Sequence, residues 1–139
     1  MEFNWQPQAL AILICRLILG ILFLFQGYEK IFRFGISGVE NIYSSELIKK
    51  GIPSGFIRAS IFLSSWIEFL GGILLIAGIW KYYTLAILGL NLTMASLAFS
   101  VMRPMWDMQH VFPRLMMLLL LLIAPPSWDI YSIDYIFNH

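Results

Sequence analysis

Four apolar segments dominate this sequence and restrict the folds that are open to it. They cover about residues 8–28, 57–79, 82–102 and 108–124. Most of them are close to the ~20 residues that a helix needs to cross a bilayer. The chain is 60% hydrophobic and only 12% charged, and so few charged residues could not cover the water-exposed surface of a soluble domain. We therefore expect an integral membrane protein.

The predicted architecture is an all-α bundle of four membrane-spanning helices in a single domain, residues 1–139. Backbone groups inside lipid have to be satisfied within the protein, and helices achieve this. Only "WKYY" joins the second and third segments, which makes them antiparallel neighbours. The connection between the first and second contains "VENIYSSELIKK", whose apolar residues fall near one helical face. This pattern predicts an amphipathic helix at the membrane interface.

Basic residues gather on one side of the predicted bundle. The positive-inside rule places such loops in the cytoplasm, which leaves both termini outside a bacterial inner (cytoplasmic) membrane. No dense basic run is present, so we expect no nucleic acid as a partner. The residues that flank the two basic loops are Lys30, Arg33, Lys49, Lys50, Arg58, Arg103 and Arg114, whereas Lys81 lies on the opposite side.

The second apolar segment carries a single carboxylate, Glu68. Ser64, Ser65, Gly71 and Gly72 recur around it at spacings of three and four residues, so they share its helical face. Small residues mark close helix contacts in membranes, and Glu68 is therefore expected to point into the bundle. A charge at the centre of a span costs roughly 2.5–3.5 kcal/mol, so we expect Glu68 to be either neutral or paired with a cation.

Three side chains are candidate partners of Glu68: Arg16, Arg114 and His110. We favour Arg16, because it lies near mid-depth on a helix antiparallel to the second one. In "WDMQHVFPR", Asp107, His110 and Arg114 follow one another at helical spacing, at the entry to the fourth segment. Asp107 and Arg114 are thus either a structural ion pair or part of an anion site.

Two further polar residues lie at depth, Gln26 in the first segment and Asn91 in the third. They are candidates either for interhelical hydrogen bonds or for ligand contacts. We expect no metal site and no haem, because His110 and His139 are the only histidines and the latter is terminal. With Cys15 as its one cysteine, the chain has no dithiol of its own.

Several motifs follow one another in an order that resembles the DoxX family of small four-helix membrane proteins. They are "RLILGILFLFQGYEKIF", "WIEFLGGILLIAGIW", an arginine-bearing fourth helix and "PPSWDIYSID", over about residues 15–134. The resemblance implies a four-helix bundle. It also implies a link of some relatives to quinone-coupled oxidation of sulfur compounds or thiols, and of others to partner binding or chaperone-like roles. The single cysteine argues against a thiol relay.

Two hypotheses follow. In the first, the bundle is the membrane component of a redox system, and a quinone between the helices accepts hydrogen bonds from Glu68, His110 and Arg114. In the second, the chain is a non-catalytic membrane subunit or chaperone-like partner that docks another protein or a further copy of itself. The sequence contains no phosphate-cradling glycine loop and no nucleophile elbow, so it leaves open whether the protein is an enzyme.

Overall fold

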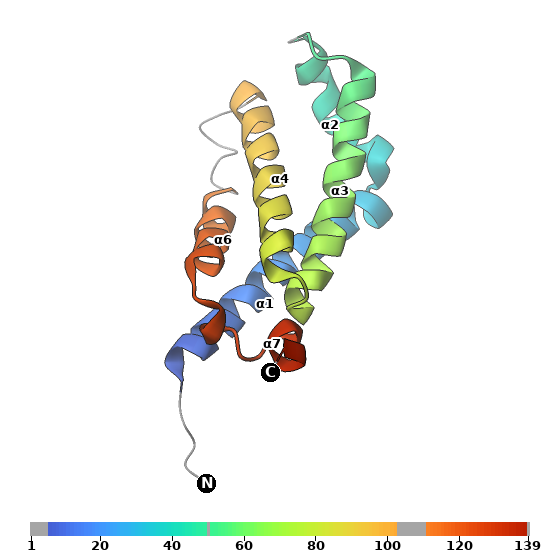
Figure 1. The fold of residues 1–139 in the computed structure, drawn as a ribbon. Helices are drawn as coiled ribbons and strands as arrows, with labels where there is room; N and C mark the ends of the chain where they lie inside the picture. The colour runs from blue at the N-terminus through green and yellow to red at the C-terminus, as the bar shows by residue number, and fades with distance from the viewer. Residues whose placement is uncertain (1–5, 50, 103–110, 139) are drawn as a thin grey trace.

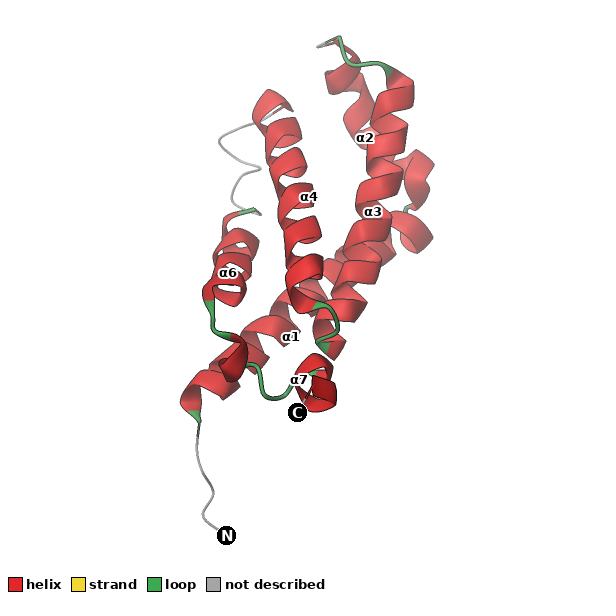
Figure 2. Cartoon of the chain, viewed as in Figure 1, coloured by secondary structure: helices red, strands yellow, loops and turns green. Residues whose placement is uncertain are grey.

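The computed structural model describes residues 6–49, 51–102 and 111–138, and every regular element within them is helical (Figure 2). In chain order the elements are α1 (Pro7–Tyr28), the π-helical turn η1 (Glu29–Arg33), α2 (Gly35–Lys49), α3 (Ser54–Ala77), α4 (Lys81–Met102), α6 (Phe112–Ile123), the 3₁₀ turn η3 (Pro126–Trp128) and α7 (Ile133–Asn138). The predicted all-α class is confirmed for these residues.

Proline and glycine set several helix ends. Pro7 opens α1, and Pro113 lies in the first turn of α6, where the missing N–H costs no intrahelical hydrogen bond. Helix α3 ends at Gly78, whose φ of +73° is left-handed and whose N–H donates to the carbonyls of Leu74 and Leu75. Glycine adopts this capping conformation without a Cβ clash, so the chain can turn sharply into α4.

Helices α1 and α3 pack along each other through a glycine seam formed by Gly20, Gly27 and Gly72. A Cβ on Gly72 would lie 2.5 Å from the nitrogen of Leu24 and 2.7 Å from the carbonyl oxygen of Gly20. A Cβ on Gly27 would lie 2.5 Å from the nitrogen of Phe69. Small residues allow backbones in a membrane to approach this closely, and the seam therefore sets the register of α1 against α3.

Apolar residues from α1, α3, α4 and α6 form one buried core. Helix α6 packs against both α1 and α4, and α4 also packs against α3 (Figure 1). The buried core cluster consists of Ile12, Cys15, Leu19, Phe23, Leu75, Leu85, Leu88, Leu92, Val111, Leu118, Leu121 and Ala124.

Two helical stretches of the described chain are long and apolar enough to cross a membrane, Pro7–Arg33 and Ser54–Ala77. Many large apolar side chains on their outer faces are exposed, Phe25, Leu63 and Leu70 among them. Such a surface suits contact with lipid, which satisfies apolar groups as well as a protein core does. Helices α4 and α6 also fall on apolar segments, and their crossing of the membrane stays a prediction.

The elements divide between two ends of the molecule. The start of α1, the turn from α3 into α4, and α7 lie at the lower end in Figure 1. The end of α2 and the start of α3 lie at the upper end. Helix α2 packs against α3 and η1, so the predicted helix between the first two apolar segments is present.

Candidate functional site

Glu68 lies on the face of α3 that the sequence spacing predicts to point inward. Its side chain is buried, with 3% of the residue exposed, and Ser65 and Gly71 on the same face are buried as well. A Cβ on Gly71 would lie 2.9 Å from the side chain of Leu88 in α4. The small residues thus bring α3 close to both α1 and α4, and the carboxylate is enclosed between them.

Side chains from three elements hold this carboxylate. The Lys30 ammonium in η1 lies 3.1 Å from Oε2 and 3.3 Å from Oε1 of Glu68. The Asn91 amide in α4 donates to Oε1 at 3.1 Å, and the Ser64 hydroxyl in α3 donates to the same oxygen at 3.4 Å. Lys30, Ser64, Glu68 and Asn91 are called the Glu68 cluster below.

The π-helical turn η1 carries Lys30. It continues α1 directly, and the N–H of Phe34 donates to the carbonyl of Glu29 at 2.8 Å, five residues back. Such wide turns are rare and recur at functional sites in helices. Lys30 remains partly exposed while Glu68 is buried, so the ammonium links the buried carboxylate to the molecular surface.

Two other predicted residues lie on elements that adjoin Glu68. Arg114, in the first turn of α6, lies within electrostatic range of the carboxylate. Gln26 precedes Lys30 by one helical turn and shares its side of α1. The Gln26 Oε1 atom is buried and accepts no hydrogen bond from the described residues.

The structure therefore brings Asn91 into contact with Glu68 and places Arg114 within electrostatic range of it, and a role of these residues in ligand binding stays a prediction. The two remaining candidates of that region, Asp107 and His110, lie outside the described residues.

The pairing of Arg16 with Glu68 that the sequence favours is corrected by the structure. Because Arg16 donates to the carbonyls of Leu75 and Ile76 at the end of α3, its guanidinium meets that helix seven to eight residues beyond Glu68, or about 10–12 Å at 1.5 Å per residue. Arg16 instead pairs with Asp129, its Nε lying 3.5 Å from Oδ1. Depth within an apolar segment could not reveal this offset.

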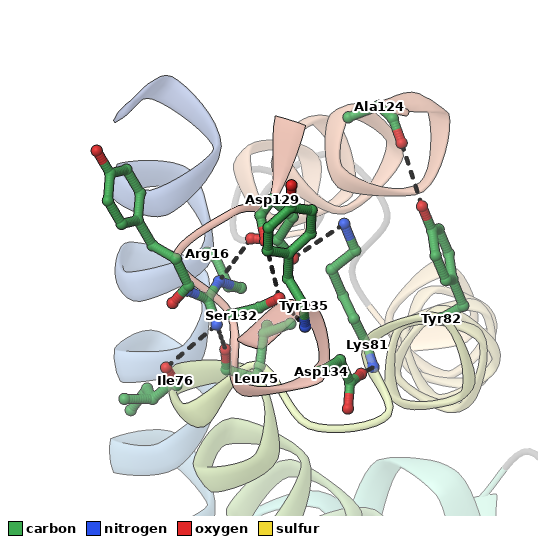
Figure 3. A network of polar contacts seen from close by, with 11 residues as sticks. Arg16, Leu75, Ile76, Lys81, Tyr82, Ala124, Asp129, Ser132, Asp134 and Tyr135 are labelled. Atoms are coloured by element: carbon green, nitrogen blue, oxygen red, sulfur yellow. Dashed lines mark hydrogen bonds and ion pairs between the residues drawn. The ribbon is translucent and has the colours of Figure 1, made fainter. Parts of the chain in front are cut away.

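Asp129 joins two buried cations from different helices (Figure 3). Its Oδ1 faces Arg16 of α1, and its Oδ2 lies 3.1 Å from the Nζ of Lys81 at the start of α4. Arg16 is 1% exposed, and Lys81 and Asp129 are 4% exposed. Arg16, Lys81 and Asp129 are called the Asp129 cluster below. The single negative charge of the Asp129 carboxylate is shared between two positive charges.

The rest of the Arg16 guanidinium binds backbone carbonyls. Nη2 donates to the carbonyl of Tyr131 at 3.2 Å, and Nη1 donates to those of Leu75 and Ile76 at 3.4 Å each. The latter two belong to the last turn of α3, where the helix dipole favours a cation. The guanidinium also occupies the space that a Cβ on Gly78 would need, so this position requires glycine for two reasons.

Polar contacts hold the segment after Asp129 on the turn between α3 and α4. The Ser132 hydroxyl donates to the carbonyl of Asp129 at 2.8 Å. The N–H of Asp134 donates to the carbonyl of Gly78 at 3.2 Å, and the N–H of Lys81 donates to Oδ2 of Asp134 at 3.3 Å. The segment is thereby attached to two helices that precede it by far in the sequence (Figure 3).

Comparison with known proteins places this chain in a family. The DoxX family model matches residues 11–103, more than half of the sequence. The chain belongs to the DoxX family. The resemblance seen in its motifs is thus confirmed. No match is found among curated proteins or among solved structures.

The DoxX match covers the residues of the Glu68 cluster and both cations of the Asp129 cluster. Asp129 itself and Arg114 lie beyond the matched residues. The Glu68 cluster therefore lies entirely within the part of the chain that the family model describes, whereas the Asp129 cluster joins that part to the segment that follows.

Sequence reasoning missed the partnership of Asp129 and Lys81 in this DoxX-family chain. In the sequence, Lys81 serves only to predict the membrane orientation. Asp129 follows two prolines, where no periodic pattern indicates which residue it contacts. A signal was nevertheless present, because "PPSWDIYSID" includes Asp129, Ser132 and Asp134 in a chain that is poor in charge.

The two clusters differ in the chemistry that they can support. In the Asp129 cluster the carboxylate pairs with two buried cations from different helices and so links those helices, although its buried Oδ1 accepts no well-aligned hydrogen bond from the described residues. In the Glu68 cluster Oε1 receives three donors, whereas the buried Oε2 lies beside Lys30 but accepts no well-aligned hydrogen bond from the described residues. That oxygen retains the capacity to accept a hydrogen bond or a proton.

Proposed function

We propose that this DoxX-family chain is the membrane component of a quinone-linked redox system related to the oxidation of sulfur compounds or thiols. The observation that carries the proposal is the Glu68 cluster, in which elements of three helices surround one buried carboxylate. Buried polar groups within a membrane are costly to maintain and usually serve a function. The reaction class comes from the family, and the site comes from the geometry.

The polar atoms of this region fit the reduced form of a quinone. A quinone supplies two-electron redox chemistry that is coupled to the transfer of two protons. Glu68 Oε2 and Gln26 Oε1 are buried acceptors that receive no well-aligned hydrogen bond from the described residues, and a quinol hydroxyl is a donor that would supply one. Lys30 balances the charge of the Glu68 carboxylate, and its partly exposed ammonium leaves the pair open to proton exchange with the surface.

The proposal includes the membrane arrangement. Helices α1, α3, α4 and α6 form a four-helix bundle in a bacterial inner membrane, with the basic loops in the cytoplasm and the termini outside. The distribution of positive charge supports this orientation. The start of α1, the α3–α4 turn and α7 also share one end of the molecule, as a common side for both termini requires (Figure 1).

Quinone content tests the redox function directly. The protein is purified in a mild detergent, extracted with organic solvent and analysed by mass spectrometry for quinones. We expect bound quinone in the wild type and in the control Glu40→Gln, whose carboxylate pairs with Arg58 away from the cluster, and its loss in Glu68→Gln. Quinone that is absent from the folded wild type, or that persists in Glu68→Gln, contradicts the proposal.

A specific observation supports a second function, that of a non-catalytic membrane subunit that docks a partner protein or another copy of the chain. Glu68 already has an ion pair and two neutral donors, as a purely structural strut would. This alternative predicts no quinone and a co-purifying protein that is retained in Glu68→Gln. Mass spectrometry of the same preparation distinguishes the two, and finding neither quinone nor partner contradicts both.

A further inference from the structure

A hollow of about 220 Å³ opens beside the Asp129 cluster, at the opposite end of α3 from its cytoplasmic loop in the proposed orientation. Lys81 and Tyr82 line it from the start of α4, and Asp129, Asp134 and Tyr135 line it from the segment that folds over them (Figure 3). The volume corresponds to about seven water molecules at 30 Å³ each. The hollow can therefore hold a small polar group.

Lys81 supplies this hollow with a buried positive charge that is incompletely satisfied. Its Nζ lies 3.1 Å from Asp129 and 4.8 Å from the centre of the Tyr82 ring, but it makes no hydrogen bond within the described residues. An ammonium has three N–H donors, and leaving them unmade in a buried position is unfavourable. An anionic group in the hollow would accept from them.

Asp134 supplies a second carboxylate on the same hollow. Its Oδ2 accepts a hydrogen bond from the N–H of Lys81 at 3.3 Å. A carboxylate offers about four acceptor positions on its two oxygens, so Asp134 retains capacity for a further donor. An ammonium group binds a carboxylate roughly twice as strongly as a neutral donor does, because both partners are charged.

We infer that this hollow binds a small zwitterion, with its anionic group on Lys81 and its ammonium on Asp134, as in the phosphoethanolamine headgroup of a phospholipid. A ligand that is only anionic would lie against the carboxylates of Asp129 and Asp134. A ligand that is only cationic would lie against the buried Lys81 ammonium. A zwitterion complements both signs of charge in the lining.

The surroundings favour a lipid as the source of this headgroup. Trp80, Tyr83 and Trp128 are exposed near the hollow, and such aromatic side chains are enriched at the level of lipid headgroups. The site is distinct from the Glu68 cluster, so it does not depend on the proposed redox function.

Lipid binding to the full chain in detergent tests this inference by native mass spectrometry. The probes are dioleoyl phosphatidylethanolamine, phosphatidylcholine and phosphatidylglycerol. We expect one phosphatidylethanolamine to bind at least about tenfold more tightly than either other lipid, the difference expected for one charge-assisted hydrogen bond. Phosphatidylcholine carries a positive charge without N–H donors, and phosphatidylglycerol lacks the ammonium altogether.

The variant Asp134→Asn identifies the carboxylate that is responsible, because asparagine retains an acceptor for the Lys81 N–H. We expect it to lower the affinity for phosphatidylethanolamine about tenfold and not to lower that for phosphatidylglycerol, whose anionic headgroup then meets one carboxylate fewer. The control Glu29→Gln, which alters an exposed carboxylate on η1, should change neither affinity.

Two results would overturn the inference: equal binding of all three lipids by the wild type, or an unchanged preference in Asp134→Asn. Added O-phosphoethanolamine distinguishes the source of the ligand. Displacement of the lipid shows that the headgroup alone suffices for recognition, whereas retention of the lipid shows that recognition also requires its acyl chains or glycerol. Both of these outcomes support a zwitterion site.

Discussion

Replacing Asp129 by asparagine should destabilise the protein more than any change to an exposed ion pair. Asp129 contacts Lys81 at 3.1 Å and Arg16 at 3.5 Å, and at an effective dielectric constant of 20 each contact is worth about 5 kcal/mol before desolvation. Asparagine no longer pays the desolvation of a carboxylate, but it leaves two buried cations uncompensated. We expect a loss of about 3–5 kcal/mol in the free energy of unfolding.

A second substitution, Lys81→Met, should change the free energy of unfolding in opposite directions in the wild type and in Asp129→Asn. In the wild type, Lys81→Met removes one of two cations from Asp129 and should destabilise the protein. In Asp129→Asn the same substitution removes a buried charge without a counter-ion, so it should raise the stability. The measurement is SDS-induced unfolding in mixed micelles, followed by helical circular dichroism of the four chains of the double-mutant cycle.

The control is Glu29→Gln, because Glu29 and Arg33 form a shorter contact, 2.9 Å, on the exposed surface. An exposed pair one helical turn apart contributes only about 0.3–0.5 kcal/mol. If Lys81→Met has the same sign in both backgrounds, or if Glu29→Gln costs as much as Asp129→Asn, burial of the charge does not determine the stability and the reasoning is refuted.

Three further predictions use the same unfolding assay or a labelling assay. Gly72→Ala should cost about 1–3 kcal/mol through overpacking of the α1–α3 contact, whereas Gly55→Ala, whose added Cβ meets no atom within 4 Å, should cost far less; equal effects would contradict the glycine seam. Lys30→Met should destabilise the protein by leaving Glu68 without its ammonium, and adding Glu68→Gln should restore part of the loss; strictly additive effects would argue against the ion pair. Cys15 is buried and its thiol faces the carbonyl of Met117, so N-ethylmaleimide should label it only after unfolding, and rapid labelling of the native protein would show that the core is open there.

The inward face of α3 could be predicted from the sequence because helical periodicity is a local property. The spacing of Ser65, Glu68 and Gly71 alone places them on one face of α3. Because the other residues of this segment are apolar and suit contact with lipid, the polar face is expected to point into the protein, and the structure buries it. The same local information gave the all-α class and the helix between the first two apolar segments. Family membership followed from motif order, and the family match confirms it.

The partners of the buried charges could not be predicted in the same way, because they depend on register between helices. The offset of Arg16 from Glu68 results from backbone contacts at Gly20 and Gly72, and no residue count within a span determines those contacts. Lys30 reaches Glu68 from a π-helical turn, which a regular helical pattern does not contain. The contacts of Asp129 with Arg16 and Lys81 arise because the chain folds back after two prolines.

The attachment of Asp129 to Arg16 also has a consequence for the order in which the protein matures. Arg16 belongs to α1, whereas its counter-ion Asp129 is synthesised long afterwards, and proteins assemble from the N-terminus onward during synthesis. Until Asp129 arrives, the bilayer holds an arginine whose charge is not balanced. A chain interrupted before that residue would keep this defect, and membrane quality control could distinguish it from a finished one by the same unpaired guanidinium.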